Sequence, residues 1–301
     1  MVKKPFLFLV VCVVIGMRYV AASNDGNYYY EASQSTNVYI GSLNVGTGEC
    51  HVVRQMNKAV IIDAGERQSS KRIKSVIKNI EDMLSGATLE AIFITHPHSD
   101  HYNLVSYILY SQNIGRSGDF KIYLGGFQRL YPDNFNNVFT AVNTARSNIR
   151  LLDGDYQFND FCISARGVLP LEMNESVVIA NASDINQFGS IIGLKFAGRR
   201  VAFLGDVDYI GFKIAMPIRA CDFSIGKDAQ SQHEMRDFLL NADMVAGLHH
   251  GLLNNAEDRI IASLLLEKQL RIFLVSADPE SYQFPILSDI LISLDRVTKL
   301  T

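Results

Sequence analysis

The sequence predicts a chain of the α/β (α+β) class, in which two sheets pack face to face with helices on the outside. Residues 37–63 contain short apolar runs separated by glycine and polar turns, a pattern typical of antiparallel strands. Further along, apolar strands alternate with amphipathic helices in both halves of the chain. Such alternation places helices on the outer faces of packed sheets.

The elements of the first half follow from hydrophobic periodicity. A helix begins after a capping Ser69 or Ser70 and ends at Leu84, because isoleucines recur along it at alternating four- and three-residue steps and Ser85-Gly86 follows. An apolar strand at 89–95 comes next. The other elements predicted for this half are strands at 37–40, 50–53, 59–62 and 120–124 and a helix at 102–111.

A hairpin is the clearest feature of the second half. Residues 190–196 and 200–204 are apolar runs separated by Ala197-Gly198-Arg199, which predicts two antiparallel strands joined by a tight turn. The other predicted elements are strands at 161–163, 177–179, 244–248 and 272–276 and helices at 137–146, 231–240, 257–266 and 287–294.

The first 22 residues predict an export signal. Lys3 and Lys4 precede an apolar core at 6–17, and Val20-Ala21-Ala22 fits a cleavage site. The core is too short for a comfortable membrane span. We therefore expect a periplasmic or extracellular protein with no transmembrane span after cleavage, or a membrane-anchored one if the segment stays. The expected organisation is a signal peptide at 1–22, a short segment at 23–36 and one domain at 37–301.

Charge and cysteine content narrow the function classes. The formal charge is −3 and becomes more negative without the signal segment, which disfavours stable binding to nucleic acid. The one dense basic run, at 71–74, falls at helical spacing and predicts a solvated helix face. Three cysteines remain after removal of residues 1–22, namely Cys50, Cys162 and Cys221. They are odd in number and widely spaced, so we expect them to be core residues with at most one disulfide.

The run His96-Pro97-His98-Ser99-Asp100-His101 carries the most chemical information. It places four potential metal ligands directly after the apolar strand predicted at 89–95. A turn there can direct two imidazoles toward one metal ion and the Asp-His pair toward another. Nitrogen and carboxylate donors suit zinc, which activates bound water, so the motif predicts a hydrolase. The alternative is a scaffold that keeps the motif without activity.

Two other strand ends deliver similar side chains. Asp206 follows the apolar residues 201–203, and His249 and His250 follow the predicted strand that begins at 244. A centre with two metals needs a bridging carboxylate and a further imidazole, which these residues supply. An ordinary turn carboxylate and a loop pair of histidines are the alternative interpretations. The repetition of one layout, a strand followed by ligands, favours a shared site.

Six short segments, at 44–50, 62–65, 96–101, 186–190, 204–206 and 249–251, form a pattern that spans about residues 37 to 292. In this order they resemble the metallo-β-lactamase-fold hydrolases. The similarity is strongest to the subgroup of ComEC-type competence proteins and surface phosphorylcholine esterases, since residues 44–50 are similar to that subgroup's D-V-G-Q-G-D-A segment.

The resemblance implies a four-layer αββα sandwich with a dinuclear site between the sheets. The implied cofactors are two divalent ions, with zinc the best match and manganese the alternative. Asp100, Asp206 and His250 are the implied catalytic residues, and Asp63 and Asn186 support the ligands from outside. The implied ligands are His96 and His98 for one ion, Asp100 and His101 for the other, Asp206 as the bridge, and His249, with His250 as its alternative or as an acid facing the substrate.

Two departures from the family pattern affect the predicted reaction. Lactamase-type members place another histidine between the motif and the bridging aspartate, but His101 is followed by no histidine until His233. The Asn186 segment occupies that interval, so one ion would have fewer ligands. Near the end of the chain, Phe284-Pro285 stands where the subgroup often has His-Pro.

The predicted function is an exported phosphodiesterase that acts on a small-molecule or surface-polymer ester. Its ions would activate water and stabilise the developing negative charge. One alternative is a hydrolase of lactones, thioesters or β-lactams, against which the absent histidine counts. The other is an exported binding protein without activity. The oligomeric state has no sequence signal.

Overall fold

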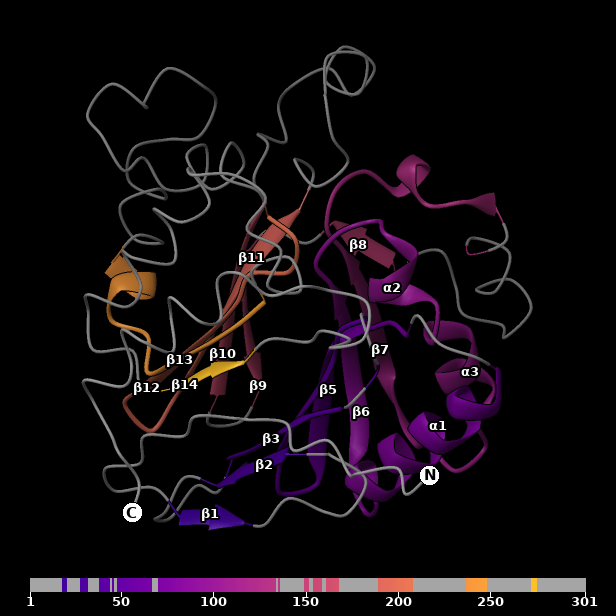
Figure 1. Ribbon diagram of the computed structural model, residues 1–301, viewed down its shortest axis with the longest axis horizontal. Coiled ribbons are helices and arrows are strands. Elements are labelled where there is room, and N and C mark those ends of the chain that lie inside the picture. Colours follow the sequence, from indigo (N-terminus) through magenta and orange to yellow (C-terminus); the bar gives the residue numbers. More distant parts are fainter. Residues whose placement is uncertain are drawn as a thin grey trace, which may run out of the picture.

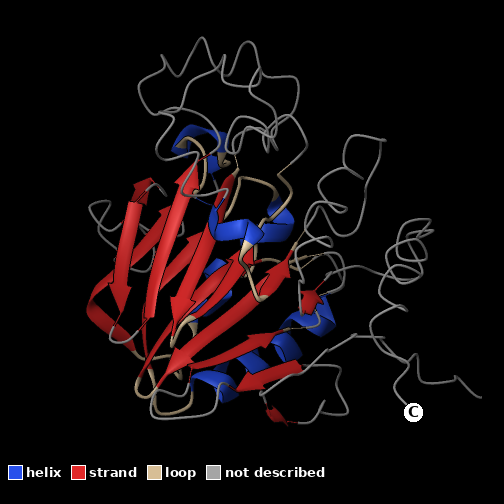
Figure 2. Cartoon of the chain, turned by 90° about the vertical axis from the view of Figure 1, so that its left-hand side faces the viewer, coloured by secondary structure: helices blue, strands red, loops and turns tan. Residues whose placement is uncertain are grey.

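The computed structural model covers all 301 residues, and the described part comprises residues 18–20, 28–31, 38–43, 45, 48–66, 70–133, 135, 149–151, 154–158, 161–167, 189–207, 237–247 and 272–274. Two β-sheets dominate this part (Figure 1). The two sheets pack on one another through a shared buried cluster, and helices lie beside the strands (Figure 2). The architecture is therefore the predicted α/β class with two sheets face to face.

The first sheet has eight strands among the described residues, in sequence order. Pairing is antiparallel from β1 to β5 and parallel from β5 to β8. Parallel neighbours need a crossover between them, which the helices after β5 and β6 provide. The strands are β1 (Arg18–Val20), β2 (Tyr28–Glu31), β3 (Val38–Ser42), β4 (Cys50–Gln55), β5 (Lys58–Ala64), β6 (Thr88–Ile94), β7 (Arg116–Leu124) and β8 (Ile149–Leu151).

The second sheet has six strands among the described residues, in the order β14-β13-β12-β11-β10-β9. The four strands from β9 to β12 pair antiparallel, and β12, β13 and β14 pair in parallel. The predicted hairpin is confirmed as β11 and β12, which turn at Ala197 and Gly198. The strands are β9 (Gly154–Phe158), β10 (Phe161–Gly167), β11 (Ser190–Phe196), β12 (Arg199–Phe203), β13 (Met244–Ala246) and β14 (Ile272–Leu274).

Helices cover the outer face of the first sheet. Helix α1 (Ser70–Leu84) connects β5 to β6, and α2 (Ser99–Tyr102) and α3 (Val105–Tyr110) lie between β6 and β7. The isoleucine stripe predicted for α1 faces this layer, where Ile80 is fully buried and Ile73 and Ile77 pack at the edge. A short 3-10 helix, η1 (Gln128–Leu130), follows β7.

Alternation along the strands builds two cores. In β5, Val60 and Ile62 face the second sheet, whereas Ala59 and Ile61 face the helices. This two-residue period follows from the pleat of a strand. Between the sheets, the ring of Phe93 stacks on Tyr123 with 4.8 Å between centroids. Both faces of the first sheet are thus buried, which explains the continuous apolar run in β6.

The outer face of the second sheet also carries helical cover, formed by residues 237–240. A Cβ added at Gly193 would lie 2.7 Å from the ring of Phe238, so that ring lies directly on β11. Lys195, on the same face of β11, reaches over the ring at 5.5 Å from its centroid. A helix, two sheets and a further helical turn therefore form successive layers.

The helix predicted at 102–111 is wrong in its bounds, because two shorter helices replace it. The N–H of Leu104 donates to the carbonyl of Ala64 at 2.8 Å, a bond to strand β5. The side chain of Asn103 accepts from the N–H of Glu66 and donates to its carbonyl. These contacts with β5 interrupt the helix between α2 and α3.

Several strands were not expected from sequence, namely β1, β2, β8 and β9. Strand β1 lies inside the segment predicted as a signal peptide and pairs with β2, with Arg18 opposite Glu31. The helices expected at 137–146, 257–266 and 287–294 and the strand at 177–179 lie outside the described residues. Within the described part, none of the helices has the length and apolar character that crossing a membrane requires.

Candidate metal centre

The site begins at the C-terminal end of β5, where Asp63 is fully buried. Its carboxylate accepts two hydrogen bonds from Thr95, from the N–H at 2.7 Å and from the hydroxyl at 2.7 Å. Asp63 has a φ of 54°, in the left-handed region that aspartate tolerates better than most residues. These bonds hold the ends of β5 and β6 together below the histidine motif.

The motif occupies the turn after β6 and the first three residues of α2. His96 and His101 are buried, whereas the His98 side chain is 37% exposed. The N–H of His101 donates to the carbonyl of His98 at 3.0 Å, which closes the turn. His96 Nε2 and His98 Nδ1 lie 3.2 Å apart. The motif therefore presents three imidazoles at one edge of the first sheet.

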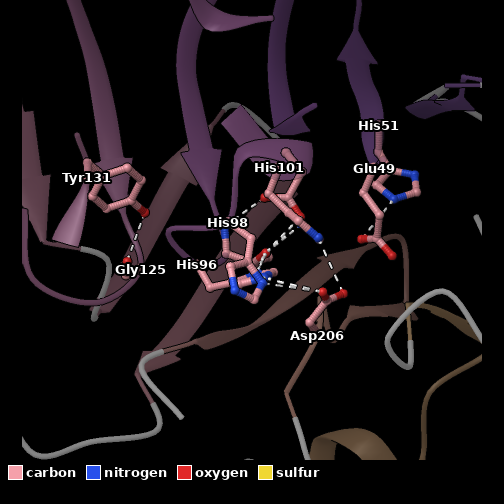
Figure 3. A network of polar contacts seen from close by, with 10 residues as sticks. Glu49, His51, His96, His98, His101, Gly125, Tyr131 and Asp206 are labelled. Carbon is pink, nitrogen blue, oxygen red and sulfur yellow. Dashed lines mark hydrogen bonds and ion pairs between the residues drawn. The ribbon is translucent and has the colours of Figure 1, made fainter. Parts of the chain in front are cut away.

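Asp206 reaches this edge from the second sheet, on the loop that follows β12. Its Oδ2 lies 3.4 Å from His96 Nε2 and 3.9 Å from His98 Nδ1. Its Oδ1 lies 3.3 Å from His101 Nε2. In Figure 3, dashed lines join the Asp206 carboxylate to the rings beside His96 and His98 on one side and to His101 above it. Each oxygen of Asp206 thus faces a different set of nitrogen donors.

The neighbours of His101 fix how its ring is used. Nδ1 lies 2.9 Å from Asp63 Oδ2, so a proton on Nδ1 is donated to that carboxylate. In the neutral ring with its proton on Nδ1, Nε2 carries the lone pair and faces Asp206. A carboxylate behind a histidine in this way orients the ring and raises its basicity as a metal ligand. Asp63 and Asp206 therefore contact opposite nitrogens of the His101 ring.

The electrostatics of the two buried rings differ. Burial lowers the pKa of His96, and the nearby His101 lowers it further. Burial also acts to lower the pKa of His101, but the charges of Asp206 and Asp63 outweigh it, so that pKa lies well above its usual value. Carboxylates on both sides thus make His101 the ring that most attracts positive charge.

The donor set fits divalent cations. His96, His101 and Asp206 are buried and offer ligand atoms that all lie within 4.8 Å of one another. Among the described residues, the buried charged and polar groups include five carboxylates but neither lysine nor arginine. Buried carboxylates need a compensating positive charge, and metal ions supply it. The five are Glu49, Asp63, Glu66, Asp100 and Asp206.

Glycines allow the loops of the site to approach closely. Gly205, just before Asp206, has a φ of +51°, and a Cβ there would lie 2.6 Å from Thr95 Oγ1. A Cβ at Gly125 would lie 1.8 Å from the Thr95 carbonyl oxygen. Any larger residue at either position would push the Asp206 loop or the end of β7 away from the motif.

The structure brings together His96, His98, His101, Asp206 and Asp63, all of which were predicted. Asp100 is buried in α2, and its backbone carbonyl accepts a hydrogen bond from the N–H of Glu49 at 3.0 Å. The predicted residues His249, His250 and Asn186 lie outside the described part. Sequence reasoning gave no role to Glu49, although it stands at the acidic position of the segment at 44–50.

The sequence also matches a family model. Residues 43–116 match the metallo-beta-lactamase superfamily. This segment runs from the loop before β4 to the start of β7, and it includes Asp63 and the whole histidine motif. Together with the two packed sheets, the match shows that the chain has the metallo-beta-lactamase fold.

Individual relatives are distant. The Endoribonuclease YSH1 of Mycosarcoma maydis is 25% identical over 197 residues, which is 62% of this chain but 22% of that protein. A metallo-beta-lactamase motif mutant of Cronobacter sakazakii is 11% identical with a TM-score of 0.40, covering 86% of this chain and 90% of the other. Human tRNase Z, short form, is 16% identical with a TM-score of 0.36, covering 66% and 70%. No substrate follows from these similarities.

Proposed function

We propose that this protein is an exported, metal-dependent phosphodiesterase with a dinuclear centre, related to the ComEC-type and phosphorylcholine esterase subgroup. The observation that carries the proposal is the position of Asp206, whose two oxygens face separate donor sets. Oδ2 faces His96 and His98, and Oδ1 faces His101. A carboxylate so placed is suited to bridge two cations, as in hydrolases that clamp a reacting ester between two ions.

Two cations bound here would supply Lewis acidity and activate water. The side chains of the site would hold these ions in place. His96, His98 and Asp206 would hold one ion, and His101 and Asp206 the other, with Asp100 and His249 completing the second set. Asp63 keeps the His101 lone pair directed into the centre through its bond to Nδ1. His250 would serve as the acid facing the substrate, and Asn186 would support the ligands.

The proposed substrate is a diester in a small molecule or a surface polymer. The negative formal charge is unfavourable for a long nucleic acid, whose binding depends on clustered lysine and arginine. The Mycosarcoma maydis relative is an endoribonuclease by name, and such an enzyme cleaves phosphodiester bonds, which supports this bond class. Export rests on the composition of residues 1–22.

The test measures metal content and turnover on the same sample of the full chain. Metal is quantified by plasma mass spectrometry, and turnover is followed with bis-p-nitrophenyl phosphate. We expect about two zinc or manganese ions per chain and hydrolysis that is lost in Asp206→Ala. Asp82→Ala is the matched control, because Asp82 lies on α1 with its side chain 62% exposed. It should keep both metal and turnover.

Three outcomes contradict the proposal in different ways. A chain that binds no metal after reconstitution with zinc and manganese is a binding protein of this fold. A metal-loaded chain that cleaves lactones or thioesters but not the diester belongs to the second enzymatic class. Equal turnover in Asp206→Ala and the wild type would show that the activity comes from a contaminant.

A further inference from the structure

Glu49 is a buried carboxylate that the proposed function has not used. It is 1% exposed and stands directly before β4. Its N–H donates to the carbonyl of Asp100 at 3.0 Å, and its own carbonyl accepts from the N–H of Gly65 at 2.8 Å. The backbone of Glu49 is therefore fixed between the first turn of α2 and the end of β5, the two segments that carry the motif and Asp63.

Two glycines make this close approach possible. A Cβ at Gly48 would lie 2.5 Å from the carbonyl oxygen of Gly65, and a Cβ at Gly65 would lie 1.7 Å from the carbonyl oxygen of Asp100. Both distances are below any real contact, so only glycine permits three backbone segments to stack here. The stack places the Glu49 side chain beside the histidine motif.

The Glu49 carboxylate lies near one ligand of the motif, His101, and near Asp63. Ligand atoms of Glu49, Asp63 and His101 all lie within 4.8 Å of one another, and all three residues are buried. In Figure 3, Glu49 lies on the side of His101 away from His96 and His98. His101 thus stands within reach of Asp63 and Asp206, which contact its two nitrogens, and of Glu49 as a third carboxylate.

His51 is a further neighbour of Glu49. Its Nε2 lies 3.7 Å from Glu49 Oε2, and its Nδ1 lies 2.8 Å from the hydroxyl of Ser42. An ion pair with His51 would balance the charge of one buried carboxylate, that of Glu49. It would leave Asp63 and Asp206, which both contact the ring of His101. The negative charge around His101 therefore favours an additional cation.

We propose that Glu49 is a carboxylate of the metal centre and contacts the cation held by His101 and Asp206. Carboxylate and imidazole donors together suit zinc and manganese. This inference rests on the proposed dinuclear centre and adds a residue to it on the side of His101. The pattern predicted there only Asp100 and His249 beside the shared Asp206.

The experiment compares zinc binding by the full-length wild type, Glu49→Gln and Glu66→Gln. Zinc affinity and stoichiometry are measured by competition with a chromophoric chelator. Glu66→Gln is the matched control, because Glu66 is equally buried near the same strand end but does not belong to the group of convergent donors. We expect Glu49→Gln to bind one of the two ions about 10- to 100-fold more weakly, and Glu66→Gln to match the wild type.

Two further variants separate a metal contact from a structural role. His51→Gln removes the partner of Glu49 and should keep wild-type zinc affinity, whereas a purely structural pair would make it behave like Glu49→Gln. Glu49→Asp keeps the charge with a shorter side chain. It should fold by circular dichroism and bind zinc with intermediate affinity, so it serves if Glu49→Gln does not fold.

The outcomes are distinguishable from those of the proposed function. The inference would be overturned if the wild type binds two ions and both Glu49 variants bind them with affinities within twofold of the wild-type values. That result would leave the dinuclear centre intact. A wild type that binds neither zinc nor manganese would overturn both. Loss of one ion in the Glu49 variants alone supports Glu49 as part of the centre.

Discussion

Replacement of Asp63 tests the hydrogen bonds beneath the centre. In Asp63→Ala, the N–H of Thr95 and the Nδ1–H of His101 lose an acceptor inside a fully buried site, whereas the Thr95 hydroxyl still has His96 Nδ1 at 3.2 Å. Each buried donor left unsatisfied costs about 1–3 kcal/mol. Alanine at a φ of 54° adds about 1 kcal/mol of backbone strain. The expected loss in the free energy of unfolding of the metal-free protein is therefore about 3–7 kcal/mol.

Asp63→Asn separates stability from metal binding. Asparagine tolerates the same φ and can still accept from the Thr95 N–H, so the stability loss should be about 1–2 kcal/mol. Its amide group would donate to His101 Nδ1, which moves the ring proton to Nε2, the atom that faces Asp206. Zinc affinity should then fall about 10- to 100-fold.

Urea unfolding followed by circular dichroism measures the first effect, and zinc competition measures the second. Asp243→Asn is the control for a carboxylate that accepts a backbone bond outside the site, from the N–H of Arg200. An Asp63→Ala variant within 1 kcal/mol of the wild type, or an Asp63→Asn variant with unchanged zinc affinity, would refute this account of the hydrogen bonds.

Three other predictions follow from particular contacts. Gly65→Ala should lower the free energy of unfolding in urea by more than about 3 kcal/mol, because its Cβ would lie 1.7 Å from the Asp100 carbonyl oxygen. Gly118→Ala, which has open space around it, should lower it by less than about 0.5 kcal/mol. Equal losses in the two variants would contradict the close packing at Gly65. Burial raises the pKa of the Cys50 thiol, and the charge of Asp63 adds to this effect. Peptide mass spectrometry should therefore find Cys50 alkylated by iodoacetamide at pH 8 only after unfolding. Labelling of Cys50 in the native protein would be inconsistent with that burial. At a free zinc concentration of about 100 times Kd, bound zinc adds about 2.7 kcal/mol to the free energy of unfolding. Removal of the zinc should therefore lower Tm by about 5–10 °C. An unchanged Tm would argue against a metal site in the folded protein.

Local patterns predicted the elements whose signals lie within themselves. Helix α1 ends at the predicted Leu84, and β11 begins and ends at the predicted residues, because an amphipathic stripe and a glycine turn are each complete in a short window. The histidine motif was placed correctly after β6 for the same reason. Its ligand types and spacing are local, and an apolar strand directly precedes it.

Features that depend on distant partners were not predicted. The break between α2 and α3 arises where Leu104 bonds to Ala64 on another strand, a contact that no helical period encodes. Strand β8 is three residues long at the end of the first sheet and is defined by its pairing with β7. The proximity of Glu49 to His101 likewise depends on Gly48 and Gly65 allowing separate segments to stack. Such information resides in packing.

Thr95 shows why the site and the fold cannot be separated energetically. Its N–H and hydroxyl bond to Asp63 on β5, and its carbonyl accepts from the N–H of Ser190, the first residue of β11 in the second sheet, at 2.8 Å. Cations held by His96 and His101 on the first sheet and by Asp206 on the second would join the same two sheets. Metal binding would therefore stabilise the same packing of the two sheets that these hydrogen bonds stabilise. The effect of a substitution at Thr95, Asp63 or Asp206 must be measured both as a change in the free energy of unfolding and as a change in metal affinity.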